Sequence, residues 1–279
     1  MFSWFKNKRE REIAEEPKKE VPSFKEESAK KILKSIKEEF GLDYEKQERV
    51  ALKKIERYAL RNEIYSFEEL AKELDISHSL KSGLINMLTV GETYFYREME
   101  QIEILCEKIL SGNTNRILSA PCSSGEEVYS ILLYLKSRGQ IPPSLHITGI
   151  DINSDALASA ERGCYSKRSV SQLPQQLLQE NFTINENRYC IDSGLRSYTS
   201  FTYANIFDRD FEDIGRFDAV LSRNMMIYFS DREKRRALKQ LSSVMHEGSI
   251  LFLGHADISF TPEGFEKVRI GRTTYFKKL

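Results

Sequence analysis

The sequence has no excess of charge of either sign, and it lacks long hydrophobic runs. Its 279 residues include 42 lysines and arginines and 42 aspartates and glutamates, so the formal net charge is zero. This balance excludes a uniformly basic protein that coats nucleic acid, although a local basic face is compatible with it. No apolar run reaches about 18 residues, and charged residues follow residues 1–5 at once, so we expect neither a membrane span nor a signal peptide. The expected location is the cytoplasm.

Cysteine and histidine are scarce, with four residues of each, and neither type is clustered. Because the cysteines lie at least sixteen residues apart, the chain contains no C-x-x-C pair for a metal or a redox centre. We expect free and mostly buried thiols at Cys106, Cys122, Cys164 and Cys190. The histidines form no i, i+4 pair, so we expect no bound metal.

The first 90 residues divide into a charged tail and a helical region. Residues 6–20 contain eleven charged side chains in fifteen positions, which is too polar for a packed core, so we expect a mobile tail over residues 1–24. From residue 25 the apolar residues recur at helical spacings, and the capping-box pattern SFEE at residues 66–69 opens one helix. Four helices, the second over about residues 44–60, are expected to form a small domain over residues 25–90.

After residue 90, short apolar runs alternate with helical stretches. The apolar runs predict strands at residues 116–120, 145–150, 217–221 and 249–254. Helices are predicted at residues 126–138, 154–162 and 231–246. This alternation predicts an α/β fold with a doubly wound, mostly parallel sheet over residues 91–279. Residues 164–202, with strand-like segments at 188–192 and 198–203, predict an inserted antiparallel β subdomain.

Two features at predicted strand ends indicate a ligand site. The first is the small-residue loop SAPCSSGEE at residues 119–127, which lets a ligand approach the backbone at a helix N-terminus. It lacks the G-x-G-x-x-G pattern, and its two carboxylates, Glu126 and Glu127, disfavour a phosphate. The second is Asp151, where an acid accepts hydrogen bonds from ribose hydroxyls. Together they indicate adenosine without phosphates, as in S-adenosylmethionine.

Each of these features also has a purely structural interpretation. Acids at a helix N-terminus interact favourably with the helix dipole, which accounts for Glu126 and Glu127 without a ligand. Aspartate is also common as a helix N-cap or turn residue, which accounts for Asp151.

Several motifs in a fixed order resemble the CheR family of chemotaxis receptor methyltransferases. They are TYFYRE at residues 93–98, SSGEEVYS at 123–130, DIN at 151–153, RNMMIYF at 223–229 and GH at 254–255. The resemblance covers about residues 25–279. It implies a class I fold that uses S-adenosylmethionine. It also implies methyl transfer to glutamate side-chain carboxylates of chemoreceptors, with S-adenosylhomocysteine as the product.

The resemblance further implies a set of cofactor-binding residues. Asp151 would bind the ribose hydroxyls, and Glu127 would bind the methionine ammonium group. Asn205 and Ile206 would lie beside the adenine. The full set comprises Thr93, Arg97, Glu127, Asp151, Asn205, Ile206, Arg223 and Asn224.

The implied reaction needs no general base, because a glutamate side chain with a pKa of about 4.3 is already ionised at neutral pH. It needs alignment of the carboxylate oxygen with the methyl carbon. We expect Arg97 to hold the carboxylate through two parallel hydrogen bonds and Tyr228 to donate another, as the catalytic pair. Each residue also has a purely structural interpretation. Arg97 could form a surface ion pair with Glu98 or Glu100, and Tyr228 could be an apolar residue at a strand end.

The second predicted helix carries a basic stripe, which we define as Arg49, Lys53, Arg57 and Arg61. Like charges four residues apart destabilise an isolated helix slightly, and a solvated face is the simplest interpretation of such a run. We favour docking of an acidic partner, which the resemblance identifies as the cytoplasmic domain of a chemoreceptor. Nucleic acid is disfavoured, because no aromatic side chains interleave the stripe.

Two positions depart from the family pattern. Gly91 stands where the family commonly has asparagine, so we expect one cofactor contact to be lost or made by the backbone. Asp257 ends a GHAD segment in place of GHSE, and the sequence assigns it no role. Two rival functions are a methyltransferase of the same fold with another carboxylate substrate and a non-catalytic receptor-binding protein. We expect a monomer.

Overall fold

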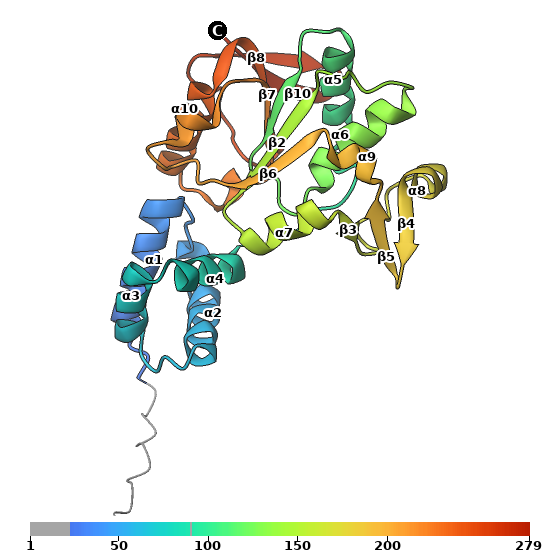
Figure 1. The fold of residues 1–279 in the computed structure, drawn as a ribbon. Coiled ribbons are helices and arrows are strands. Elements are labelled where there is room, and N and C mark those ends of the chain that lie inside the picture. The colour runs from blue at the N-terminus through green and yellow to red at the C-terminus, as the bar shows by residue number, and fades with distance from the viewer. Residues whose placement is uncertain (1–22, 90) are drawn as a thin grey trace, which may run out of the picture.

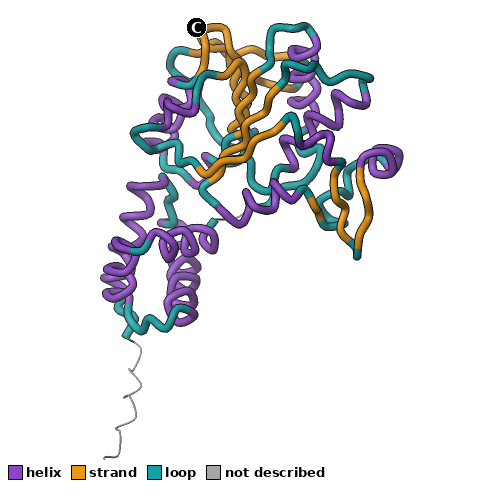
Figure 2. Tube along the Cα trace, in the orientation of Figure 1, coloured by secondary structure: helices purple, strands orange, loops and turns teal. Residues whose placement is uncertain are grey.

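The computed structural model describes residues 23–89 and 91–279. They form a helical domain, a seven-stranded sheet with its helices, and a small three-stranded sheet (Figures 1 and 2). Most of the charged tail expected over residues 1–24 lies outside the described residues. Its last two residues are packed, because the N–H of Ser23 donates to the carbonyl of Tyr65 at 2.8 Å and the Phe24 ring lies 4.8 Å from the Phe67 ring.

Four α-helices form the helical domain: α1 (Glu26–Phe40), α2 (Glu48–Arg61), α3 (Phe67–Ile76) and α4 (His78–Leu88). A short 3-10 turn, η1 (Glu45–Gln47), occupies the residues where the sequence predicts the start of the second helix. Ser66 caps α3 as its pattern predicts, because its Oγ accepts a hydrogen bond from the N–H of Glu69 at 3.1 Å. Gly41 ends α1 in the left-handed conformation, with a φ of 74°.

The seven-stranded sheet has the order β6-β2-β1-β7-β8-β10-β9. Its strands are β1 (Arg116–Ser119), β2 (His146–Asp151), β6 (Thr199–Tyr203), β7 (Phe217–Ser222), β8 (Met245–Leu253), β9 (Phe265–Ile270) and β10 (Thr273–Lys278). The first five strands in this order run parallel to one another, and β10 runs antiparallel to both of its neighbours, β8 and β9. The arrangement confirms the predicted α/β fold with a mostly parallel sheet.

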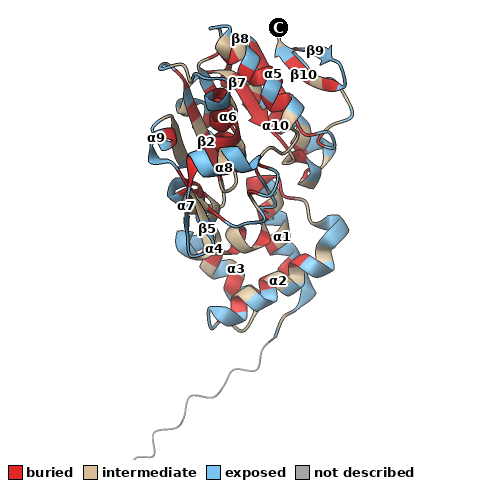
Figure 3. Ribbon diagram, turned by 90° about the vertical axis from the view of Figure 1, so that its right-hand side faces the viewer, coloured by how far each residue is buried: buried red, intermediate tan, exposed pale blue. Residues whose placement is uncertain are grey.

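Helices pack on the sheet and divide its apolar residues between two cores. These helices are α5 (Met99–Leu110), α6 (Glu126–Ser137), α7 (Ser154–Arg162) and α10 (Asp231–Ser243). Successive side chains of a strand point to opposite faces, so Leu118 of β1 shares a core with Leu238 of α10, whereas Ile117 shares the other core with Ile102 of α5. Figure 3 shows the buried residues along the strands and the inner sides of these helices. The first core also includes residues of the helical domain, such as Leu88.

The helices differ from the predictions mainly at their ends. The helix predicted at residues 231–246 ends at Ser243, because the chain turns there into β8, which begins at Met245. Within residues 23–89 and 91–279, no helix combines the length and the apolar character needed to cross a bilayer.

A three-stranded antiparallel sheet, of order β3-β5-β4, is inserted between α7 and β6. The inserted segment contains the strands β3 (Cys164–Tyr165), β4 (Phe182–Asn185) and β5 (Arg188–Ile191), and the short helices α8 (Gln175–Asn181) and α9 (Ser193–Arg196). The segment at residues 198–203, predicted as an antiparallel strand of this subdomain, instead contributes β6, which pairs in parallel with β2. The sequence misleads there because β6 is an edge strand. Its side chains are half-buried or exposed, so it lacks the apolar run of a central strand.

The prediction of four free thiols is wrong for two of them. Cys164 and Cys190 form a disulfide between β3 and β5, where they stand directly opposite each other in the antiparallel pair. They are 26 residues apart in the sequence, so only the pairing of the strands reveals them as neighbours. Cys106 and Cys122 are free and buried, as expected.

Gly125 provides a close contact between the loop after β1 and α7. Its φ is 88°, and a Cβ there would lie 2.9 Å from the Cβ of Ala160. We expect Gly125→Ala to lower the free energy of unfolding by about 2–4 kcal/mol, because positive φ and the steric clash both oppose it. Gly112→Ala is the matched control, since its φ is 85° but a Cβ would meet nothing within 4 Å, and it should cost about 1 kcal/mol. Urea unfolding measures both, and equal losses would show that the contact with α7 is unimportant.

Candidate cofactor and catalytic site

A cleft lies at the C-terminal ends of β1, β2 and β7, where open α/β sheets bind ligands. Its apolar compartment lies between the sheet and the helical domain, and the lining includes Ala51, Leu88, Ile150, Asp151 and Ile206. Its polar compartment includes Thr93, Arg97, Cys122, Glu127 and Arg223. The two compartments adjoin, because both are lined by Gly91, Pro121, Ser123 and Asn224.

All eight residues that the family resemblance implies for the cofactor line this cleft. The polar compartment contains Thr93, Arg97, Glu127, Arg223 and Asn224. The apolar compartment contains Asp151, Asn205, Ile206 and again Asn224. The two predicted catalytic residues are divided, with Arg97 in the polar compartment and Tyr228 in the apolar one.

Asp151 is fixed by the backbone around it. Its Oδ2 accepts a hydrogen bond from the N–H of Ser123, and its Oδ1 accepts one from the N–H of Asn153, both at 2.8 Å. Asp151 is 8% exposed, and burial raises the pKa of its carboxyl group, an effect that the two hydrogen bonds oppose. The N-cap of α7 is Asn153 and not Asp151. The carboxylate of Asp151 therefore joins the loop after β1 to the loop after β2 and is a rigid acceptor at the cleft.

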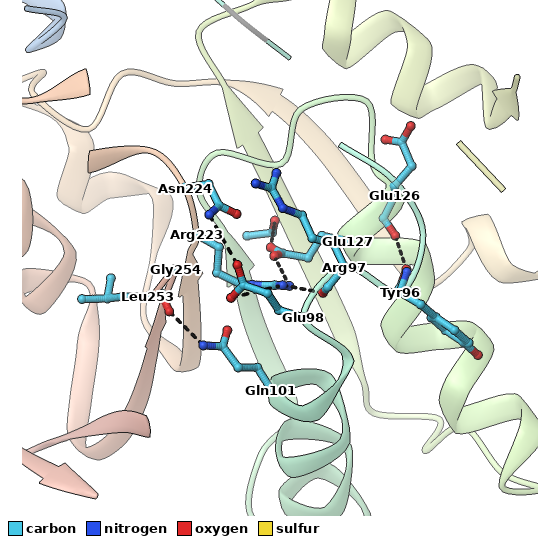
Figure 4. Close-up of polar contacts among 12 residues, drawn as sticks. Tyr96, Arg97, Glu98, Gln101, Glu126, Glu127, Arg223, Asn224, Leu253 and Gly254 are labelled. Carbon is cyan, nitrogen blue, oxygen red and sulfur yellow. Dashed lines mark hydrogen bonds and ion pairs between the residues drawn. The ribbon is translucent and has the colours of Figure 1, made fainter. Parts of the chain in front are cut away.

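The polar compartment is organised around the guanidinium of Arg223, whose side chain is 3% exposed. One terminal nitrogen lies 2.8 Å from Oε2 of Glu127 (Figure 4). The other lies 3.7 Å from Oε2 of Glu98 and donates to the carbonyl of Arg97. Ser119 donates to the remaining oxygen of Glu127 at 2.7 Å. Arg223 thus neutralises and orients the acids that face it.

The two acids at the start of α6 have different environments. In Figure 4, Glu126 points away from the Arg223 cluster, and its Oε2 accepts a hydrogen bond from the hydroxyl of Ser124 at 2.7 Å. Glu126 is 2% exposed, and burial raises its pKa. It lines neither compartment, so Glu127 alone of the pair belongs to the cleft.

Cys122 lies in the polar compartment but is not suited to nucleophilic attack. Burial, followed by the negative charges of Asp151 and Glu127, raises the pKa of its thiol well above the ordinary value. The thiol is therefore protonated at neutral pH, which excludes the thiolate that such attack requires.

Asp257, to which the sequence assigns no role, holds the loop that follows β7. It is fully buried, and its Oδ2 accepts hydrogen bonds from the N–H groups of Asn224 and Gly254, each at 2.7 Å. Its Oδ1 accepts one from the N–H of Met226 at 2.8 Å. A Cβ at Gly254 would lie 2.7 Å from Oδ2 of Asp257, so a glycine is needed for this approach. Asp257 therefore ties Arg223 and its neighbours to the end of β8.

Arg97 is half-buried and is held by one hydrogen bond. Its Nη1 donates to the carbonyl of Glu92 at 2.8 Å, and its guanidinium lies 5.8 Å from the centre of the Tyr94 ring. The structure contains no ion pair of Arg97 with Glu98 or Glu100, so that alternative is wrong, and Glu98 faces Arg223 instead. The guanidinium has further N–H donors that a ligand can use.

Tyr228 lies in a 3-10 turn, η3 (Met226–Tyr228), and not at a strand end, so the apolar strand-end alternative is wrong. The turn follows β7 and the loop that Asp257 holds. The carbonyl of Tyr228 accepts a hydrogen bond from the N–H of Asp43 at 2.9 Å, which connects the turn to the helical domain. The ring of Tyr228 is half-buried and lines the apolar compartment.

Asn205 also joins the apolar compartment to the helical domain. Its Nδ2 donates to the carbonyl of Glu39 at 2.9 Å and to Oδ1 of Asp208 at 3.1 Å. Its Oδ1 accepts from the N–H of Phe207 at 3.0 Å. The amide is therefore occupied by protein partners. Asn205 and Ile206 are 4% and 6% exposed and form part of the wall.

The basic stripe lies on the exposed side of α2. Arg49, Lys53, Arg57 and Arg61 are all exposed, and the ion pairs described within the helical domain involve other residues. An adjacent side of α2 lines the apolar compartment through Val50, Ala51 and Lys54. Sequence reasoning missed this contribution to the cleft, because these residues look like an ordinary amphipathic helix surface.

Comparison with known proteins identifies the family. Residues 91–274 match the model described as CheR methyltransferase, SAM binding domain. The Chemotaxis protein methyltransferase of Campylobacter jejuni subsp. jejuni serotype O:23/36 (strain 81-176) is 32% identical over 251 residues, covering 89% of this chain and 95% of the relative. Chemotaxis protein methyltransferase 2 of Vibrio cholerae serotype O1 is 37% identical over 188 residues, covering 63% and 65%. An O-methyltransferase family protein from Burkholderia thailandensis has a TM-score of 0.41 at 12% identity, covering 72% of this chain and 60% of that one.

The chain therefore belongs to the CheR family. It is an S-adenosylmethionine-dependent methyltransferase of chemotaxis, and the family and the cofactor predicted from the motifs are confirmed.

The cleft suits this cofactor in each of its parts. The apolar walls of Ile150 and Ile206 suit a flat base, and the rigid carboxylate of Asp151 suits a ribose diol. The polar compartment contains both signs of charge, as a zwitterionic amino acid requires.

We expect Asp257→Asn to lower the free energy of unfolding by about 1–3 kcal/mol, because an amide NH₂ would face backbone N–H groups that now donate to a carboxylate. Chemical denaturation at neutral pH measures this change. Asp75→Asn, at an exposed position on α3, is the control and should change stability by less than about 0.5 kcal/mol. A loss of stability no larger than that of the control would show that the carboxylate of Asp257 does not hold the loop after β7.

Proposed function

We propose that this methyltransferase transfers the methyl group of S-adenosylmethionine to glutamate side-chain carboxylates of chemoreceptors and forms methyl esters. One observation carries the proposal: α2 presents the exposed basic stripe on one side and lines the cofactor cleft on another. An acidic protein surface that docks on the stripe therefore lies beside the cleft. The family membership supports the same substrate class, because the relatives carry the name chemotaxis protein methyltransferase.

In this proposal the compartments bind different parts of the cofactor. Asp151 accepts hydrogen bonds from the ribose hydroxyls, and Ile206 packs against the adenine beside Asn205. Glu127, held by Arg223 at 2.8 Å, faces the ammonium group of the methionine part. Thr93, Arg97 and Asn224 also line the polar compartment, and the remaining N–H donors of Arg97 are available for the carboxylate of the substrate.

The reaction is a displacement at carbon. The bound cofactor supplies a methyl group on a sulfonium. A glutamate oxygen forms the new C–O bond while the C–S bond breaks. The electron pair of the C–S bond stays on sulfur, so the products are a neutral thioether and a neutral ester. The substrate carboxylate is ionised at neutral pH, so the protein needs no base. Arg97 and Tyr228 orient the carboxylate from the two compartments, which share Asn224 in their linings.

Replacement of the Tyr228 phenol tests its role. We expect Tyr228→Phe to lower kcat for receptor methylation by about 10- to 100-fold, because a hydrogen bond to a charged group is lost. The Kd for S-adenosylhomocysteine, measured by calorimetry, should stay within about twofold of the wild-type value. Tyr203→Phe, at an exposed position on β6, is the matched control and should leave kcat unchanged. An unchanged kcat in Tyr228→Phe would remove Tyr228 from the catalytic pair.

The docking role of the basic stripe predicts that charge reversal there lowers kcat/KM for the receptor, most strongly at low salt. We expect the double reversal Lys53→Glu with Arg57→Glu to lower kcat/KM for the receptor by about 10- to 100-fold at low salt, and to reduce its dependence on ionic strength. The control is Lys267→Glu with Arg269→Glu on β9, which makes the same charge change at exposed positions on the far edge of the sheet. If the stripe variant keeps both the rate and the salt dependence of the wild type, docking on α2 is wrong.

Incubation with labelled S-adenosylmethionine and a chemoreceptor cytoplasmic domain tests the function itself. We expect label on the receptor that mild base releases as methanol, as an ester does. Label that resists base would indicate another acceptor. No incorporation, with S-adenosylhomocysteine binding intact, would indicate a non-catalytic receptor-binding protein.

A further inference from the structure

The helical domain makes a dense set of hydrogen bonds to the loop that follows Asp151. They centre on Asn86 of α4, near the start of α7, and the two helices lie together in Figure 1. The side-chain Oδ1 of Asn86 accepts from the N–H of Ser154 at 3.0 Å, and its Nδ2 donates to the hydroxyl of Ser154 at 2.9 Å. The backbone carbonyl of Asn86 accepts from Nδ2 of Asn153 at 3.2 Å.

Asn153 carries these contacts on to Asp151. Its N–H donates to Oδ1 of Asp151 at 2.8 Å, and its own Oδ1 accepts from the N–H of Ala156 as the N-cap of α7. Its Nδ2 also donates to the hydroxyl of Thr89 at 2.8 Å, one turn after Asn86. A continuous series of hydrogen bonds therefore leads from α4 to the carboxylate at the end of β2.

The helix that provides Asn86 is itself fixed. Its neighbours Leu84, Ile85 and Leu88 are each 1% exposed and belong to the core that the helical domain shares with the sheet. Asn86 is half-buried, with its amide on the loop and not in the core. A loop held in advance by a rigid helix loses less freedom when a ligand binds, and this improves affinity.

We propose that Asn86 is a positioning residue for the cofactor, acting through Asn153 and Ser154 to hold the carboxylate of Asp151 in its binding orientation. The proposal rests on the cofactor site proposed above, and it gives the helical domain a role in cofactor binding besides docking. Asn86 lines neither compartment of the cleft, so its effect is indirect.

Calorimetry with S-adenosylhomocysteine tests this role in the full chain. We expect Asn86→Ala to raise the Kd by about tenfold, because two side-chain hydrogen bonds to the loop are lost. The KM for S-adenosylmethionine should rise in parallel, whereas kcat at saturating cofactor stays within about twofold. Asn62→Ala is the matched control. The amide of Asn62 donates a hydrogen bond too, to the carbonyl of Tyr58, but it lies at the exposed end of α2, far from the loop after Asp151 in the sequence. The Kd of Asn62→Ala should therefore equal that of the wild type.

Ser154→Ala separates positioning from general destabilisation. It removes one acceptor of the Asn86 amide, so we expect a smaller rise in Kd, of about threefold. In the double variant with Asn86→Ala, the Kd should rise by less than the product of the two single effects, because both changes remove the same hydrogen bond. If Asn86→Ala does not fold, the Kd of Ser154→Ala decides the question.

Asp151→Ala provides the reference for the site. If it weakens binding strongly while Asn86→Ala binds as the wild type does, the positioning role is overturned and the cofactor site stands. Independent, multiplicative effects of Asn86→Ala and Ser154→Ala would overturn it as well. If Asp151→Ala itself binds normally, the proposed cofactor site and the role of Asn86 both fail.

Discussion

A guanidinium that is almost entirely buried needs partners for its charge, and the polar half of the cleft is built around this requirement at Arg223. Glu127 and Glu98 supply the negative charge, from the start of α6 and the start of α5. The backbone that carries Arg223 is held in turn by Asp257, whose carboxylate accepts hydrogen bonds from two N–H groups of the loop after β7 and from one at the end of β8. Charge burial at one residue thus determines how three separate segments meet at the cleft.

The apolar half of the cleft depends on a different constraint, the core that the helical domain shares with one face of the sheet. Because Leu88 and its neighbours are buried in that core, α2 and α4 are held against the strand ends. The domain then contributes walls, through Ala51, and hydrogen bonds, through Asn86. In the proposed function, this places receptor docking and cofactor binding on one folded unit, so an acidic substrate bound at the basic stripe lies next to the cleft.

The net charge of zero conceals an uneven distribution of basic and acidic side chains. The exposed stripe of α2 is basic throughout, whereas the cleft contains the carboxylates of Asp151 and Glu127 together with the guanidinium groups of Arg97 and Arg223. Each sign suits the ligand proposed for its place: an acidic receptor surface outside, and a ribose, an ammonium and a sulfonium inside. In the proposed reaction the protein needs to do little beyond alignment, because a glutamate carboxylate is already ionised at neutral pH.

The sequence by itself determined the α/β class, the family and the cofactor, because strand and helix periodicities and the ordered motifs are local properties of the chain. All eight residues that the family resemblance implies for the cofactor line the cleft, and six of them lie within the motifs, whereas Asn205 and Ile206 lie outside them. Only the tertiary structure assigned β6 to the large sheet and paired Cys164 with Cys190. It also brought the N–H groups after β7 to the carboxylate of Asp257, and Asn86 to the loop after Asp151. Each of these depends on contacts between segments far apart in the sequence, and no local pattern records which distant segments pack together.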